Sequence, residues 1–436
     1  MIRFRTFRSF WQIFILVALA PLVSIRAQEV LLREGETNAR AGTFTVPFIF
    51  SSDALGASAG VSVGNRGWIQ PQASTFLTAV GSAEGSAYGF LALRDLEIPG
   101  VERLFVNAQA NLGTFSEIDL YQSGNPDFSG ERAGSNGSDA ENFITGDGRD
   151  NAAWLRFLYV MPMGAGGEDP TSTLVLHDGL PVQGRDTSAW NPLRGGYSLV
   201  GVKPFYRKQT VTTEETGDDE AATAGAEFLL HYHNTDFADN PSRGSYQQLR
   251  YTRDWGTLGS SAPWETVDFE AGKYFALGTG RHTRQRVLAL SAWLIDTPSW
   301  NDVDVEDGAE VFHRPPAYAG ATLGGLERMR GFSEGRYHDR AAAYYAAEYR
   351  HIPDWNPLRD AALLRWMHAR VDWLQYVAGV EVGRVADDFD LGELHSAMQT
   401  SGILGLRAMV NHLVVRADCG ISAEGAAVQM TIDQPF

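Results

Sequence analysis

Residues 326–351 read LERMRGFSEGRYHDRAAAYYAAEYRH, in which a charged, turn-prone segment is followed by alternating small and aromatic residues. Side chains of an extended strand point to opposite faces in turn. One face of a strand over 340–351 would carry Ala343, Tyr345, Ala347 and Tyr349, and the other Tyr344, Ala346, Glu348 and Arg350. The alternation predicts a strand with one apolar face and one face that holds a carboxylate.

The same period of two recurs on both sides of this strand. Residues 412–421, HLVVRADCGI, alternate in this way, and Cys419 falls on their apolar face. In 55–64 and 102–112 the second face is mostly uncharged and rich in serine, glycine, asparagine and glutamine. A strand face that carries polar side chains and many glycines suits the interior of a barrel better than the packed core of a sandwich.

We count sixteen such runs, an even number as expected of a closed antiparallel bacterial barrel. They lie near residues 55–64, 73–82, 87–96, 102–112, 153–161, 171–178, 197–207, 225–235, 245–255, 265–275, 284–294, 340–351, 370–384, 399–409, 412–421 and 427–436. We interpret 43–51, TFTVPFIFS, as a lead-in or as part of the first strand. One short helix is expected near LGELHSAMQ at 391–399.

The predicted connections are unequal in length. Short ones such as 98–101 and 409–411 alternate with long, polar, acidic ones at 113–152, 208–224 and 295–339. Outer-membrane barrels have short periplasmic turns and long outer loops. The lengths therefore favour this class of protein.

The beginning of the sequence and its charge narrow the class further. Arg3, Arg5 and Arg8 precede an apolar run up to about Val23, which predicts a secretory signal peptide over 1–27, with an uncleaved anchor as the alternative. Removing it takes away four arginines and no acid, so the net charge changes from −17 to −21. Such acidity argues against nucleic acid as a partner. With Cys419 as its single cysteine, the chain can form no intramolecular disulfide.

No apolar run of about 18 residues follows the signal peptide, so no further membrane helix is expected. Two classes remain: a soluble exported β protein, and a membrane barrel whose strands hide their apolar character by alternation. The alternation favours the barrel. We therefore expect 28–436 to form an all-β, 16-stranded antiparallel transmembrane β-barrel with no other domain.

Two carboxylates and one arginine form the candidate site in the barrel interior. Alternation in LQYVAGVEVGRVAD, residues 374–387, places Glu381 on the same inner wall as Glu348 and on a neighbouring strand. Two such acids repel each other unless a cation lies between them. Arg330 can supply it if the connection 295–339 folds inward, and Gly331 permits a tight turn. The alternative is an arginine exposed in an outer loop.

Other polar groups give weaker signals. His231 and His233 share a strand face with Glu227, an arrangement that could bind a metal, although lumen-facing side chains in contact with water are the simpler interpretation. The acidic runs TTEETGDDE and NDVDVEDG do not have EF-hand spacing. We find no phosphate-binding glycine loop, no His-Glu-x-x-His and no Gly-x-Ser-x-Gly. We therefore expect no cofactor, no metal and no enzymatic activity.

Several of these segments together resemble a known family. The segment LGGLERMRGF, the strand AYYAAEYRH, then VEVGRVAD, SGILGLR and a last strand ending at Phe436 are similar to the barrel of the 85-kilodalton outer-membrane protein superfamily. This is the bacterial surface antigen family, which includes BamA, TamA and FhaC. The resemblance is strongest over about 320–436. It implies a sixteen-stranded barrel with a long late loop folded inward.

The resemblance also implies roles for particular residues. The tip of the inward loop would be Arg330, Gly331 and Phe332, and it would be locked against Glu348 and Glu381 on the inner wall. At the position of Glu381, many members have an aspartate. In the family, the first and last strands meet at a weak seam. The alternating residues of the last strand match the terminal signal by which the barrel assembly machinery recognises its substrates, here Val428, Met430, Ile432 and Phe436.

Members that insert or secrete proteins carry amino-terminal POTRA domains, for which this sequence has no room, so it resembles the subgroup that lacks them. We expect a protein of the bacterial outer membrane, in contact with its lipids, that acts in membrane biogenesis or in transport of a lipid or polypeptide, with a periplasmic partner or client. The alternative is a passive or solute-selective channel plugged by the loop 295–339. A third hypothesis, a barrel-embedded enzyme using His231, His233 and Glu227, ranks last.

Overall fold

The computed structural model describes residues 32–34, 42–52, 56–122, 124–213, 217–306, 308–362, 364, 369–411 and 413–436. The predicted signal peptide, 1–27, lies outside these residues. No helix in the described part of the chain is long and apolar enough to cross a membrane.

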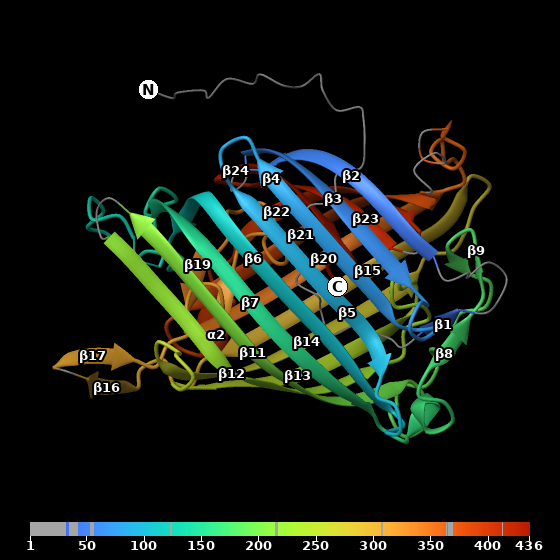
Figure 1. Ribbon diagram of the computed structural model, residues 1–436, viewed down its shortest axis with the longest axis horizontal. Helices are drawn as coiled ribbons and strands as arrows, with labels where there is room; N and C mark the ends of the chain where they lie inside the picture. Colours follow the sequence, from blue (N-terminus) through green and yellow to red (C-terminus); the bar gives the residue numbers. More distant parts are fainter. Residues whose placement is uncertain are drawn as a thin grey trace.

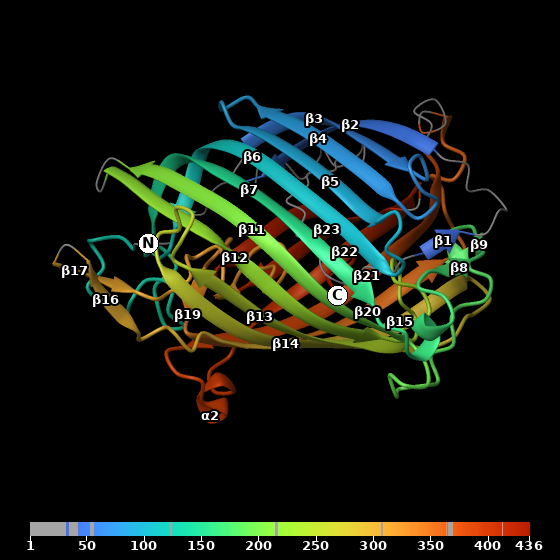
Figure 2. The ribbon, with the colours of Figure 1, turned by 60° about the horizontal axis from the view of Figure 1, so that its bottom comes forward.

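One antiparallel sheet dominates the structure, as the alternation predicts, and its neighbouring strands follow one another along the chain. Within the described residues it contains sixteen strands, in the order β2 (Gly42–Ser52), β3 (Gly56–Arg66), β4 (Ser74–Ser82), β5 (Ala87–Glu97), β6 (Leu104–Leu120), β7 (Ile144–Val160), β11 (Tyr197–Thr213), β12 (Gly217–His233), β13 (Gly244–Trp255), β14 (Pro263–Ala276), β15 (Thr283–Asp296), β20 (Ala341–Pro353), β21 (Val371–Ala386), β22 (Gln399–Val410), β23 (Leu413–Ser422) and β24 (Gly425–Ile432). The sheet curves round a central space (Figures 1 and 2).

Short elements lie outside this sheet. β1 (Leu32–Glu34) pairs in parallel with β8 (Ser172–Leu174), and three small hairpins are β9–β10 (Leu176–His177, Leu180–Pro181), β16–β17 (Val303–Glu306, Ala309–Phe312) and β18–β19 (Ala321–Leu323, Tyr337–Asp339). A 3-10 helix, η1, spans Gly164–Gly167. The helix expected near 391–399 is present as α2 (Leu391–Leu394), where Asp390 accepts a hydrogen bond from the backbone of Glu393 as its N-cap.

Two assignments of strands are wrong. Residues 43–51 form most of β2 in the main sheet, whereas the run 171–178 contributes only the small pieces β8 and β9. Pro47 is compatible with β2 because this strand pairs only with β3, and an edge strand can lack a hydrogen-bond donor.

Two predicted loops are also largely strand. Residues 208–213 and 217–224 continue the hairpin of β11 and β12, where Lys208 and Glu220 form an ion pair of 2.7 Å. Likewise β6 and β7 extend to Leu120 and from Ile144, so much of 113–152 is paired. These extensions carry mostly polar and charged residues, such as Lys208, Thr212, Asp218 and Glu220, so the apolar alternation ends before the strand does.

The two faces of the sheet differ as the alternation predicts. On the outer face, large apolar side chains are exposed on many strands, among them Leu77, Leu112, Leu230, Phe269 and Leu404. The inner face of β3 and β4 carries the buried hydroxyls of Ser62 and Thr78, whose oxygens lie 2.7 Å apart. A belt of exposed leucine and phenylalanine round a polar interior is typical of a membrane-spanning barrel.

The two ends of the sheet overlap instead of pairing. On the outer face of the last strands, Leu404 is 59% exposed, but Val415 and Ile432 are only 6% and 7% exposed. They belong to a buried apolar cluster with the inner-face residues Tyr88 and Phe90 of β5. Arg94 of β5 also forms an ion pair of 2.8 Å with Asp433. Among the described residues no pairing joins β2 to β24, so closure into a barrel by edge pairing stays a prediction.

Candidate functional site

In the connection between β15 and β20, the part from Ala321 to Arg340 lies against the inner face of the sheet, whereas the hairpin β16–β17 projects away from it (Figure 1). Its hairpin β18–β19 packs near β20 and β21, and the tip that follows turns back on itself, with the backbone of Gly325 donating to Phe332 and that of Phe332 donating to Met329. Met329 adopts a positive φ of 58° in this turn. The inward position of the late loop, expected from the resemblance, is thus present in the structure.

Arg330 at the tip is completely buried and contacts three carboxylates on three different strands. Its Nε donates to Glu381 Oε1 at 2.9 Å, and its terminal nitrogens reach Glu348 Oε1 at 2.7 Å and an Oδ of Asp418. The backbone N–H of Arg330 also donates to Glu381 Oε2 at 2.7 Å. One guanidinium therefore joins the loop to β20, β21 and β23.

The three acids differ in their other partners. Glu348 also accepts hydrogen bonds from Arg350 at 2.8 Å and from Arg407 at 2.8 and 2.9 Å. Asp418 is 3.2 Å from Arg416. Glu381 accepts hydrogen bonds from the hydroxyls of Tyr344 at 2.6 Å and Ser401 at 3.1 Å. In the described part of the chain, Arg330 is the only cationic side chain in contact with Glu381.

Sequence reasoning found three members of this cluster and missed four. The sequence pattern assigns no role to Asp418, Arg407 or Arg416, and it places Arg350 on the inner face without a partner. A signal for Asp418 and Arg416 was present, since alternation already put them on the polar face of 412–421. The sequence does not show which residues of neighbouring strands lie side by side, because that depends on the strand register.

The tip approaches the wall so closely that it needs a glycine on the opposing strand. A Cβ at Gly420 of β23 would lie 2.2 Å from the carbonyl oxygen of Arg330. Gly331 is similarly confined, with a Cβ there 2.9 Å from the backbone of Ile421, and its carbonyl accepts a hydrogen bond of 2.7 Å from Ser422 Oγ. Contact between two backbones explains the glycines on both sides of this interface.

Phe332 and Phe436 both lie in a buried apolar cluster inside the curve of the sheet. β24 ends at Ile432, so Phe436 does not extend the outer face of that strand as predicted. Instead its carbonyl accepts a hydrogen bond of 3.0 Å from Arg350, whose guanidinium lies 5.0 Å from the Phe436 ring. Figures 1 and 2 place this end of the chain within the curve.

The other residues predicted for the terminal signal are divided between environments. Val428 is exposed and Met430 is half-buried on the outer face, whereas Ile432 is buried beneath β5. The pattern is broken because the chain bends inward after Ile432. Their role as an assembly signal stays a prediction.

A second network ties the loop to β14 and β15, which adjoin β20 in the sheet. Arg328 lies over the Trp293 ring, 3.9 Å from its centroid, and donates to Glu270 of β14 at 2.9 Å. Trp293 in turn donates to Asp268, which also accepts from Arg250. The loop thus contacts both β20–β23 and β14–β15.

The histidine pair does not form a metal site with Glu227. The rings of His231 and His233 are 5.4 Å apart, but Glu227 contacts Lys203 at 2.6 Å and Arg156 at 3.5 Å. Among the described residues, no group of three or more His, Cys, Asp or Glu side chains is placed to hold a metal ion. Glu227 therefore neutralises cations on the inner wall.

Comparisons with known proteins give a fold and no closer relationship. No family model matches the sequence, and no curated protein matches it either. CdiB from Escherichia coli has a similar structure, with a TM-score of 0.51 and 11% identity over 89% of this chain and 61% of that one. CdiB from Acinetobacter baumannii matches with a TM-score of 0.47 and 12% identity over 89% of this chain and 59% of that one. BamA from Haemophilus ducreyi lacking POTRA domains 1–3 matches with a TM-score of 0.45 and 12% identity, over 90% of this chain and 69% of that one.

The chain therefore spans about three fifths of the length of the two CdiB chains. Its fold is all-β and antiparallel, of the kind found in E. coli CdiB. A likeness at this level of identity defines the architecture and leaves the activity to be argued from the molecule itself.

Proposed function

We propose that this protein is an outer-membrane member of the superfamily that includes BamA and CdiB, and that it acts in membrane biogenesis or in transport of a lipid or polypeptide. The observation that carries the proposal is the overlap at the ends of the sheet. β2 and β24 each have one edge that is unpaired among the described residues, and β24 lies under β5.

An unpaired edge is a template for another strand. If β24 moved outward, its N–H and C=O groups and those of β2 would become available to an incoming strand. Arg330 fixes β20, β21 and β23 to the loop and does not contact β24. Arg350 and Arg407 of the same cluster hold Phe436 and Gln434, which follow β24, so these two contacts would have to break for β24 to move. The last strand would then move against a rigid support.

Folding of a second barrel protein into liposomes tests this proposal. We expect liposomes that contain the protein to accelerate folding relative to empty liposomes. In a Cys419→Ser background, Arg94→Cys and Asp433→Cys joined by a short bismaleimide should abolish the acceleration, whereas the same variant without the reagent should retain it. An unchanged folding rate with the unlinked protein would refute the insertase activity.

The alternative function is a passive or solute-selective channel plugged by the loop 295–339. It is favoured by the buried position of Arg330 and Phe332 within the interior. Deletion of 325–336 should then raise ion conductance in planar bilayers. Absence of conductance in both the full chain and the deletion variant would count against a channel.

A further inference from the structure

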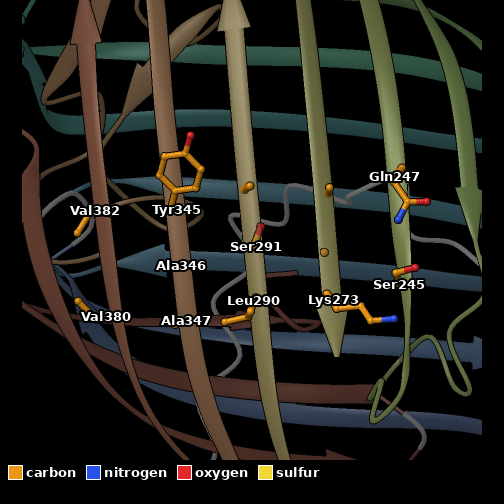
Figure 3. Close-up of a pocket in the computed structure, with 13 residues that line it drawn as sticks. Ser245, Gln247, Lys273, Leu290, Ser291, Tyr345, Ala346, Ala347, Val380 and Val382 are labelled. Carbon is orange, nitrogen blue, oxygen red and sulfur yellow. The ribbon is translucent and has the colours of Figure 1, made fainter. Parts of the chain in front are cut away.

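A shallow groove lies on the outer face of the sheet, across β13, β14, β15, β20 and β21 (Figure 3). Its volume is about 600 Å³, within the range of ligand pockets in proteins. The groove is on the face opposite to Arg330, so it belongs to neither the charged cluster nor the overlap of the sheet ends.

Small side chains form the floor of this groove. Ala271 pairs with Ala292 across β14 and β15, and Ala347 of β20 lies two residue pairs away, where it pairs with Leu290. Exposed side chains stand on either side, with Phe269 beyond one end and Phe275 beyond the other. Three alanines among larger neighbours leave a hollow with an apolar floor.

One end of the groove is polar. Lys273 is exposed and is paired in register with Ser245, and Gln247 lies two residues further along β13, where it pairs with Ala271. All three line the groove (Figure 3). Within the described residues no carboxylate lies within ion-pair distance of Lys273, and its ammonium is 5.8 Å from the Phe275 ring.

The position of Lys273 along the wall is unusual. At the other end of β13 and β14, the outer face carries Arg253 paired with Glu265 at 2.9 Å. Between that pair and Phe275, the outward side chains of β14 are Val267, Phe269, Ala271 and Lys273. A lysine inside an apolar belt is costly unless its ammonium reaches the interface or an anion.

We propose that this groove binds a phospholipid with a net negative headgroup. One acyl chain lies over Ala271, Ala292 and Ala347, and the phosphate accepts hydrogen bonds from Lys273 Nζ and the Gln247 amide. The absence of a neighbouring carboxylate among the described residues selects a net negative headgroup over a zwitterionic one. This inference rests on the proposed membrane location of the barrel.

Native mass spectrometry of the full chain tests the proposal, with phosphatidylglycerol and phosphatidylcholine of identical acyl chains added together. One lysine near an anionic lipid contributes about 1 kcal/mol, so we expect about fivefold preferential retention of phosphatidylglycerol. Lys273→Gln should reduce this ratio to about one. The matched control Lys208→Gln changes a lysine at the tip of β11–β12, which already pairs with Glu220, and should leave the ratio unchanged.

A second variant tests the apolar floor. Ala292→Phe fills the groove and should lower retention of both lipids while leaving Lys273 in place. Equal retention of the two lipids by the unaltered protein, or the same preference in Lys273→Gln, would overturn the proposal. Extraction of the protein from liposomes by alkaline carbonate would refute the membrane location itself, whereas a resistant protein without lipid preference refutes only the lipid site.

Discussion

The last strands of the sheet are held on their two faces by contacts of different chemistry. On the inner face, Arg330 joins three carboxylates at complete burial. On the outer face, Val415 and Ile432 pack against Tyr88 and Phe90. The charged contact requires each donor to meet its acceptor, because a buried ion without a partner is very costly. The apolar contact requires only that volume be filled.

Loss of Arg330 should have the largest effect. In Arg330→Ala, Glu381 keeps two hydroxyl partners and loses its cation, so we expect the free energy of unfolding to fall by about 3–5 kcal/mol. Urea unfolding in detergent or lipid, followed by the gel mobility shift of the folded protein, measures it. Arg253→Ala is the control, since its partly exposed pair with Glu265 should contribute less than about 1 kcal/mol.

A double-mutant cycle between Arg330 and Glu381 should show which acid depends most on the loop. Glu381 has no other cationic contact among the described residues, so Arg330→Ala and Glu381→Ala should be sub-additive by about 1–3 kcal/mol. The coupling of Arg330 with Glu348 should be smaller, because Arg350 and Arg407 remain beside that acid. Additive losses in the first cycle would mean that the two residues act independently.

The close approach of the backbones can be tested with a single methyl group. Gly420→Ala places a Cβ against the carbonyl of Arg330 and should cost about 1–3 kcal/mol by forcing the tip away. Gly402→Ala is the matched control on β22, where a Cβ has nothing within 4 Å. Equal stability of the two variants would show that the tip does not rest on β23.

The apolar contact should tolerate changes that the charged contact does not. Ile432→Val should lower the free energy of unfolding by only about 0.5–1.5 kcal/mol, because it removes one methylene group. Arg330→Lys should cost more, since an ammonium lacks the planar fork that reaches three carboxylates at once. Thermal unfolding of the two variants side by side measures the difference. If Arg330→Lys were the more stable, the contrast between the two contacts would be wrong.

Sequence reasoning reached the site because its geometry follows from period two. Glu348 and Glu381 face inward as predicted, and both contact Arg330. It missed Arg407 because no partner for that side chain is visible until register sets it beside Glu348. It misplaced Phe436 because a bend after β24, not the alternation of the strand, decides where the ring lies.

The sequence by itself determined which face most strand residues occupy, since alternation is a local property of the extended backbone. It also determined that two inward acids require a cation. Only the tertiary structure decided that Asp418 and three further arginines share the cluster, and that the last strands lie beneath the first. These features depend on strand register and sheet curvature, which arise from hydrogen bonds and packing between strands far apart in the chain. Neither register nor curvature produces a repeating pattern of residues in the sequence.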